Sequence, residues 1–235
     1  MAGDDVVIVT GAAGNLGRAV FRELDRRGLR VAAVDRQLAP VEALLAGSAT
    51  PSRHMAFGDA DLESAATAEK IIEDITARRG AIYGVVHTVG GFAAAPIAES
   101  DLALFEQMFK LNVGTTVNMV RAVLPRLRAA GRGSIVVISA GAALRAPSGL
   151  AAYSAAKSGV IRLVESVADE TKHAGVRINA ILPSTINTPQ NRAAMPQADF
   201  ASWVTPDEIA QTIGFLMSDE SSGITGAAIP ISGRT

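Results

Sequence analysis

The stretch that decides the fold is DVVIVTGAAGNLG, from Asp5 to Gly17. A short apolar run, typical of a strand, leads directly into the glycine-rich TGAAGNLG and then into a helical pattern. This order predicts a nucleotide site, because glycine lets the backbone approach a pyrophosphate and the helix start offers unpaired N–H groups. The residues of this site are Gly11, Gly14, Asn15, Leu16 and Gly17. An ordinary tight turn is the alternative.

The rest of the chain continues the alternation of apolar runs and amphipathic segments. Predicted strands cover residues 5–10, 30–35, 53–57, 82–88, 134–140, 176–182 and 227–232, and predicted helices cover 15–27, 64–79, 101–130, 151–174 and 206–218. Apolar runs without a polar face are typical of strands buried on both sides, as in a parallel sheet. The pattern predicts an α/β fold with a single doubly wound, Rossmann-type domain over 1–235, a mostly parallel sheet of about seven strands, and helices on both faces.

Two features interrupt this regular pattern. Pro125 lies inside the third helical segment, where a proline kinks or divides a helix. Residues 184–204 lack periodicity and contain two prolines and Trp203. Long irregular segments in compact domains often form lids or binding loops, so a substrate lid is expected here. The alternative is a surface excursion packed under Trp203.

Composition argues against several classes of protein. With 22 basic and 23 acidic residues among 235, the overall charge gives no indication of nucleic-acid binding. No apolar run is long enough to span a membrane and the acidic N-terminus does not resemble a secretion signal, so a cytoplasmic location is expected. The chain has no cysteine, and His54, His87 and His173 lack the neighbours that a metal site requires.

An acidic residue at the end of the second predicted strand extends the nucleotide site. Asp35 follows Gly17 by eighteen residues, where a carboxylate can bind ribose hydroxyls. Its charge disfavours a 2′-phosphate, so NAD(H) is the preferred cofactor, while the adjacent Arg36 keeps NADP(H) open. A solvated loop carboxylate is the alternative for Asp35.

The second motif is YSAAK, from Tyr153 to Lys157, within the helical segment 151–174. Residues four apart share one face of a helix, so Lys157 lies one turn from Tyr153. An ammonium about 4 Å from a phenolate, at an effective dielectric of about 20, lowers the phenol pKa by roughly three units. We therefore expect a pair suited to acid–base catalysis, with a surface pair on an ordinary helix as the alternative.

Together, these motifs resemble the short-chain dehydrogenase/reductase family over nearly the whole chain. The resemblance implies that Tyr153 is the catalytic acid–base, that Lys157 also binds the nicotinamide ribose, and that Asn112 supports a water-linked proton path. The further cofactor contacts that it implies are Asp61 and Leu62 beside the adenine, Gly90, and Pro183, Ile186 and Thr188 beside the nicotinamide carboxamide. Family members commonly associate through the long helices, which implies a homodimer or homotetramer.

The chain departs from the family pattern in three places. Gly14 arrives one position early in the glycine motif, a spacing that related subfamilies share. HTVGG, from His87 to Gly91, replaces the usual NNAG, and His87 is expected to pack at a strand end. The family serine thirteen residues before the tyrosine, which hydrogen-bonds the substrate oxygen, is Ala140 here.

Of these three departures, the missing serine has the largest consequence for the reaction. Ser139 lies one residue before Ala140, and on a regular strand one step points a side chain to the opposite face. Either a bulge redirects Ser139 into the site as a catalytic hydroxyl, or the site works without one. Losing such a donor typically costs a factor of about 10²–10³ for a carbonyl substrate.

One branch of the family, the dihydropteridine reductases, shares this pattern. They use NADH, keep the tyrosine and lysine, lack the serine, and reduce a quinonoid pteridine whose electron-poor ring accepts hydride. The segment Leu182 to Trp203, VGGF at Val89 to Phe92, and the terminal GRT resemble these enzymes. The candidates for the substrate wall are Phe92, Asn191, Met195 and Trp203.

Three functions, each with a small-molecule partner, remain open at this point. The first is an NADH-dependent reductase of a quinonoid dihydropteridine or a similar conjugated imine. The second is a ketone reductase or alcohol dehydrogenase in which Ser139 or another donor replaces the serine; the surroundings of Asn112 favour it. The third is a non-enzymatic nucleotide sensor, against which the intact Tyr153 and Lys157 argue.

Overall fold

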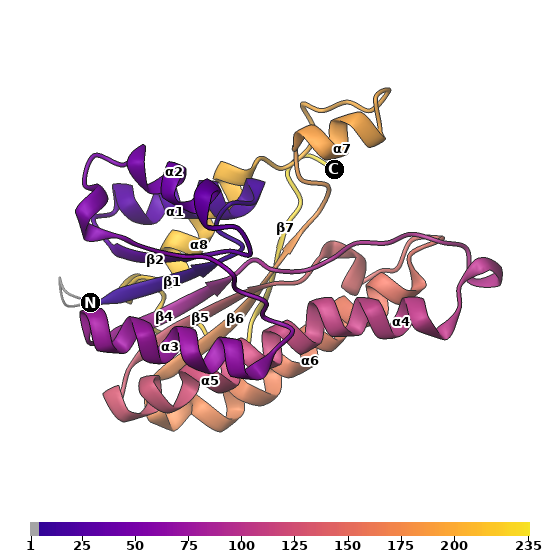
Figure 1. The fold of residues 1–235 in the computed structure, drawn as a ribbon. Coiled ribbons are helices and arrows are strands. Elements are labelled where there is room, and N and C mark those ends of the chain that lie inside the picture. Colours follow the sequence, from indigo (N-terminus) through magenta and orange to yellow (C-terminus); the bar gives the residue numbers. More distant parts are fainter. Residues whose placement is uncertain (1–4) are drawn as a thin grey trace.

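A parallel sheet of seven strands forms the centre of the computed structural model, which describes residues 5–235 (Figure 1). The strands are β1 (Val6–Thr10), β2 (Arg30–Val34), β3 (Met55–Phe57), β4 (Ile82–His87), β5 (Gly133–Ile138), β6 (Val176–Pro183) and β7 (Ala228–Ile231). Their spatial order is β3-β2-β1-β4-β5-β6-β7, so the direction of winding reverses between β1 and β4. The predicted strands and fold class are confirmed, and this switch point is where such sheets bind ligands.

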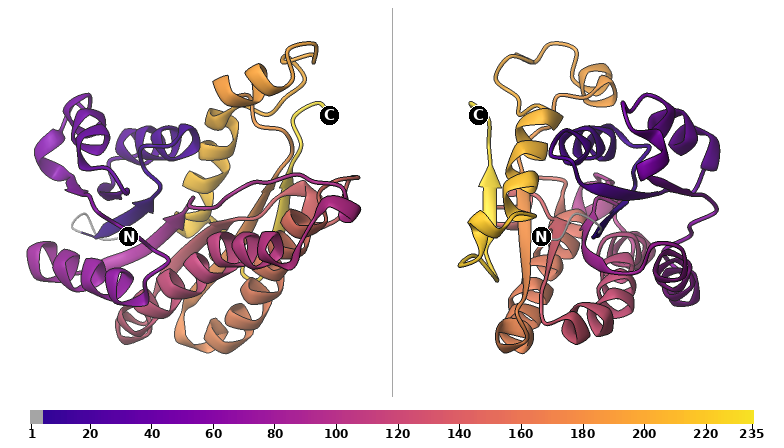
Figure 2. Two further views of the ribbon diagram at one scale, coloured as in Figure 1. Left: turned by 45° about the vertical axis from the view of Figure 1, so that its right-hand side comes forward. Right: turned by 90° about the vertical axis from the view of Figure 1, so that its left-hand side faces the viewer.

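Helices cover both faces of the sheet (Figure 2). One layer contains α1 (Asn15–Arg26), α2 (Leu38–Ala46) and α8 (Pro206–Leu216), and the other contains α3 (Ala65–Arg79), α5 (Thr115–Ala130) and α6 (Ala151–Thr171). Side chains alternate along β1, so Val6 and Ile8 pack into one layer while Val7 and Val9 pack into the other. This burial on two sides explains why β1 is a continuous apolar run. Within residues 5–235, no helix combines the length and apolar character needed to cross a membrane.

The third predicted helix consists of three segments. α4 (Leu102–Phe109) leads through a π-helical turn, Lys110–Gly114, into α5. The chain is not divided at Pro125, because α5 continues through it on the solvent-exposed side, where water can bond the carbonyl that loses its N–H partner. The helical geometry changes instead at the π turn, a feature that concentrates at functional sites.

The irregular segment 184–204 contains a short helix, α7 (Pro189–Ala194), capped by the Thr188 side chain. The two ends of the segment meet, because Ile186 and Val204 form a parallel bridge. Figure 1 shows α7 beyond the strands and near the C-terminus. The sequence analysis missed α7 and α2, although a threonine cap followed by proline in the first helical position is a recognised start signal for α7.

Candidate active site

The glycine-rich turn joins β1 to α1 at the carboxyl edge of the sheet. Gly11 has a φ of +67°, and a Cβ there would lie 2.7 Å from Thr88 Oγ1. A Cβ at Gly17 would lie 2.1 Å from the carbonyl oxygen of Gly11, so the turn requires glycine at both positions. Gly14 is the N-cap of α1. The next three residues, Asn15, Leu16 and Gly17, form the first helical turn, whose N–H groups have no acceptor within the helix.

Asp35 is tied to this turn from the end of β2. Its Oδ2 accepts a hydrogen bond from Ala13 N at 2.9 Å, and its Oδ1 accepts one from Arg36 N at 2.8 Å. Asp35 is partly buried, and these two bonds hold its carboxylate at the turn. The Arg36 side chain turns away and bonds Asp61 Oδ1 at 3.2 Å and Glu63 Oε1 at 2.8 Å.

Asp61 and Leu62, the predicted adenine neighbours, differ in exposure. Asp61 is exposed, whereas the Leu62 side chain is buried in the core with the α3 layer. Any contact of Leu62 with an adenine ring would therefore use its backbone.

Tyr153 and Lys157 extend from the start of α6 into a cavity of about 580 Å³. Lys157 Nζ donates a hydrogen bond to the Ile138 carbonyl oxygen at 2.8 Å and lies 5.9 Å from the centre of the Tyr153 ring. The Tyr153 hydroxyl forms no hydrogen bond with any residue in 5–235. The expected helical stacking of the two residues is therefore present, but the ammonium points toward β5.

The expected lowering of the Tyr153 pKa is wrong. Burial raises the pKa of Tyr153 to about 12 and lowers the pKa of Lys157 to about 8. Both shifts have the same cause, because burial penalises the charged form of each group. The Lys157 ammonium bonds the Ile138 carbonyl, and its attraction does not offset the effect of burial on the Tyr153 phenol. At neutral pH the phenol keeps its proton and the lysine is mostly charged.

The π-helical turn brings Asn112 close to Gly90, near the Lys157 ammonium. Asn112 Oδ1 accepts from Gly91 N at 3.2 Å, and its Nδ2 donates to the carbonyl oxygens of Met108 and Gly91 at 2.9 and 3.1 Å. A Cβ at Gly90 would lie 2.7 Å from Asn112 Oδ1 and 3.1 Å from Lys157 Nζ. The absence of a side chain at Gly90 therefore lets the amide and the ammonium approach one stretch of backbone.

His87 is a buried residue at the end of β4, as predicted. Its Nδ1 lies 2.8 Å from Thr10 Oγ1, and its Nε2 lies 3.2 Å from Thr115 Oγ1. Because the Thr115 hydroxyl donates to the Leu111 carbonyl oxygen, we assign the imidazole hydrogen to Nε2. Burial lowers the pKa of His87 to about 3, so the ring is neutral at pH 7 and links Thr10 at the end of β1 to Thr115 at the start of α5.

The Ser139 hydroxyl bonds the protein backbone. It is buried and donates to the Lys157 carbonyl oxygen at 2.8 Å. The register of β5 with β6 continues up to this residue, and Ser139 N donates to the Ile181 carbonyl oxygen. The bulge that would redirect Ser139 is therefore absent from this strand end. Ser139 and Ala140 both line the cavity, and Ala140 has no hydroxyl to offer there.

The cavity beside Tyr153 collects most residues predicted for the substrate and nicotinamide. Phe92, Pro183, Ile186, Asn191 and Met195 line it. The Phe92 ring meets the Tyr153 ring edge-on, with 5.0 Å between their centres. The prediction for Trp203 is wrong, because its indole is buried against Phe200 and anchors the segment 184–204 instead of lining the cavity.

The segment 184–204 also reaches the glycine-rich turn. Asn15 Nδ2 donates to Gln190 Oε1 at 2.7 Å, so α7 touches the start of α1. Thr188 caps α7 and does not line the cavity. The sequence analysis missed three polar residues that do line it, Arg145, Ser184 and Thr185, because no spaced motif marks them. In residues 5–235, no three His, Asp or Glu side chains gather where they could hold a metal ion.

Comparison with known proteins identifies the class. The model of the short chain dehydrogenase family matches residues 5–199. D-threitol dehydrogenase of Mycolicibacterium smegmatis is 32% identical over 97% of this chain and 91% of its own length, and levodione reductase of Leifsonia aquatica is 30% identical over 98% and 93%. The solved structure of a short-chain type dehydrogenase/reductase from Mycobacterium ulcerans superposes with a TM-score of 0.91 at 28% identity, covering 98% of this chain and 89% of that one.

The fold, the glycine-rich turn and these relatives define an oxidoreductase of a class that binds NAD(P). More particularly, the chain belongs to the short chain dehydrogenase family. The alternative of a non-enzymatic sensor is thereby set aside. The finer resemblance to dihydropteridine reductases stays a prediction.

Proposed function

We propose that this protein uses NADH to reduce a small conjugated electrophile, such as a quinonoid dihydropteridine. The observation that carries the proposal is the arrangement of Ser139 and Ala140. The serine hydroxyl donates to the Lys157 carbonyl, and a methyl group occupies the position of the family serine. A ketone oxygen that develops negative charge needs a donor there. A ring whose conjugation already withdraws electrons depends less on such a donor.

The nucleotide half of the site supports NAD(H). Gly11 and Gly17 form a turn that a side chain would fill, and Asp35 would accept hydrogen bonds from ribose hydroxyls. Bound NADH supplies the hydride. The remaining cofactor contacts would come from Asp61, the Leu62 backbone, Gly90, Lys157, Pro183, Ile186 and Thr188. A 2′-phosphate would meet the charge of Asp35, which favours NAD(H) over NADP(H).

Tyr153 would donate the proton that the reduced substrate nitrogen takes up. The phenol is protonated at neutral pH because burial raises its pKa to about 12. After donation, the nearby Lys157 ammonium would stabilise the phenolate, and Asn112 lies where it could support the return of a proton through water. The segment 184–204 would act as the lid, because Asn191 and Met195 line the cavity and Gln190 bonds the glycine-rich turn.

A second candidate is a ketone reductase or alcohol dehydrogenase. The names of the relatives favour it, since one is a D-threitol dehydrogenase and another a levodione reductase. The cavity also contains two further hydroxyls. Ser184 donates to the Ser232 carbonyl oxygen at 2.9 Å, whereas the Thr185 hydroxyl bonds nothing within residues 5–235. Thr185 would then be the replacement donor.

One assay separates the two candidates. Purified protein is tested for NADH oxidation with a quinonoid dihydropteridine and with a panel of linear and cyclic ketones. Reduction of the pteridine with a kcat/KM about 100-fold above that of any ketone is expected, because the site lacks the oxygen donor. The reverse ranking supports the second candidate and overturns the first.

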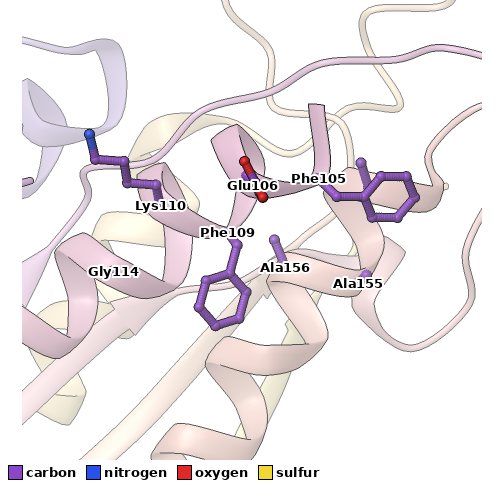
Figure 3. Close-up of a pocket in the computed structure, with 8 residues that line it drawn as sticks. Phe105, Glu106, Phe109, Lys110, Gly114, Ala155 and Ala156 are labelled. Atoms are coloured by element: carbon purple, nitrogen blue, oxygen red, sulfur yellow. The ribbon is translucent and has the colours of Figure 1, made fainter. Parts of the chain in front are cut away.

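We also infer a homodimer or homotetramer formed through α4, α5 and α6. A groove of about 700 Å³ between α4 and α6 is lined mainly by Phe105, Phe109, Ala152, Ala155 and Ala156 (Figure 3). Phe109 is 56% exposed, and a second copy laid along these helices would remove it from water. Light scattering coupled to size exclusion tests this inference, and a species of 24.2 kDa alone would contradict it.

A further inference from the structure

A network of four charged side chains lies next to Asp35, where the adenine end of the cofactor is expected. Glu63 Oε1 accepts from Arg36 at 2.8 Å, and Glu63 Oε2 accepts from Lys110 Nζ at 2.9 Å. Arg36 also bonds Asp61 at 3.2 Å. Figure 3 shows Lys110 extending away from the ring of Phe109. Glu63 is thus the one member of this network that contacts both cations.

Exposure distinguishes Glu63 from its partners. Its side chain is 20% exposed, whereas those of Arg36 and Lys110 are 60% and 66% exposed. Hydrogen bonds, first from Lys110 and then from Arg36, lower the pKa of Glu63, so it is ionised at neutral pH. The better-buried carboxylate therefore holds two exposed cations in their observed directions.

The position of Arg36 gives this network a consequence for the cofactor. Arg36 directly follows Asp35, and an arginine near this carboxylate is the group that accommodates a 2′-phosphate. The guanidinium offers a planar fork of donors that matches a phosphate. Here that fork already bonds two carboxylates, so a 2′-phosphate would have to displace them and would meet their negative charge.

We propose that Glu63 sets the preference for NAD(H) over NADP(H) by holding Arg36 away from the 2′-phosphate position. The shorter contact, the lower exposure and the second bond to Lys110 make Glu63, more than Asp61, the residue that holds Arg36. This inference rests on the proposed use of NADH and adds a second determinant to the charge of Asp35.

Binding of NADH and NADPH to the free protein tests the proposal without a substrate. Dissociation constants are measured by fluorescence titration at one low ionic strength, because salt screens exposed charges. Glu63→Gln removes the charge and keeps the shape. It should tighten NADPH binding by about tenfold and change NADH binding by less than about twofold. Unchanged NADPH affinity in this variant overturns the proposal.

Two further variants identify the group responsible. Glu69 of α3 is the control residue, because its exposed carboxylate pairs with Arg121 at 3.1 Å, outside the network of Glu63. Glu69→Gln should leave the affinities for NADH and NADPH unchanged. The double variant Glu63→Gln with Arg36→Gln should lose the tighter NADPH binding of Glu63→Gln. If the tighter binding persists, Arg36 does not bind the 2′-phosphate and the proposal is overturned. Thermal unfolding of each variant confirms its fold. Equal wild-type affinities for both cofactors overturn the role of Glu63 alone, whereas a wild type that binds neither overturns the proposed reductase as well.

Discussion

Ser139 and Lys157 are joined by a hydrogen bond of 2.8 Å from the serine hydroxyl to the lysine carbonyl oxygen. In the opposite direction, the Lys157 ammonium donates to the carbonyl oxygen of Ile138, also at 2.8 Å. These two bonds close a ring between the end of β5 and the first turns of α6. The ring holds the ammonium beside the cavity, and we infer from it that Ser139 positions Lys157 and does not polarise the substrate.

Ser139→Ala should therefore affect stability more than turnover. The change leaves the buried Lys157 carbonyl with one bond fewer, which should lower the free energy of unfolding by about 1 kcal/mol. Turnover should stay within about threefold of wild type, because the hydroxyl does not face the reacting atoms. Urea unfolding and initial rates measure the two effects. A loss of turnover by a factor of about 10² with little change in stability would instead identify Ser139 as the missing donor.

Ala140→Ser is the complementary change. It places a hydroxyl where a methyl group now lines the cavity and should raise kcat/KM for ketones by about 10–100-fold. Reduction of a quinonoid dihydropteridine should change little, because its ring needs less polarisation. Rates with both substrate types are compared for the variant and the wild type. An equal rise in kcat/KM for ketones and for the dihydropteridine would show that polarisation of the substrate oxygen does not distinguish the two substrates.

The sequence contains enough information to predict the sheet and the two motifs. β1 is a continuous apolar run because both of its faces are buried, and the turn requires glycine at positions 11 and 17. Tyr153 and Lys157 share a helical face because of their spacing alone. The strands, the turn and the Tyr153–Lys157 spacing depend on residues close in the chain, or on the burial of a complete strand or helix.

Features set by distant contacts could not be predicted. The direction of the Tyr153 pKa shift depends on burial, and Lys157 bonds the carbonyl of Ile138, nineteen residues away. The π turn at Asn112 has no periodic signal. Arg36 and Glu63 are 27 residues apart, and no motif pairs them. The chemical type of Trp203 predicts a place in the cavity wall, whereas the structure buries its ring beside Phe200.

Lys157 should be required for turnover, although its buried charge lowers the free energy of unfolding. Its pKa falls from 10.5 to about 8 on folding, so the unfolded chain binds more protons between these values and stability should rise with pH across that window. Lys157→Met should abolish turnover yet raise the free energy of unfolding at pH 7 by about 1–3 kcal/mol, and this gain should shrink above pH 8.

Urea unfolding at several pH values tests this trade-off. Lys70→Met is the control, because its side chain is 73% exposed and should show no comparable gain. A Lys157→Met protein that is less stable than wild type at pH 7 would show that the ammonium is better solvated than its burial indicates.

Gly90→Ala should damage the site without damaging the sheet. The added Cβ would lie 2.7 Å from Asn112 Oδ1 and 3.1 Å from Lys157 Nζ, so one or both groups must move. Displacement of reacting groups by about 1 Å typically lowers turnover by about 10²-fold. Gly223→Ala is the matched control, because its added Cβ would contact nothing within 4 Å. Steady-state rates with circular dichroism test this prediction, and wild-type turnover in Gly90→Ala would exclude a role for the close approach.

Tyr153→Phe tests the acid–base role most directly. It removes a hydroxyl that bonds nothing in residues 5–235, so the fold and its stability should be unchanged. Turnover should fall by about 10²–10⁴-fold, the usual contribution of a general acid, whereas the Kd for NADH should change by less than about threefold. Tyr83→Phe is the control, because Tyr83 is the other of the two tyrosines and lies in β4. Comparable losses in the two variants would point to general damage to the protein, and wild-type-like turnover in Tyr153→Phe would exclude the phenol as the proton donor.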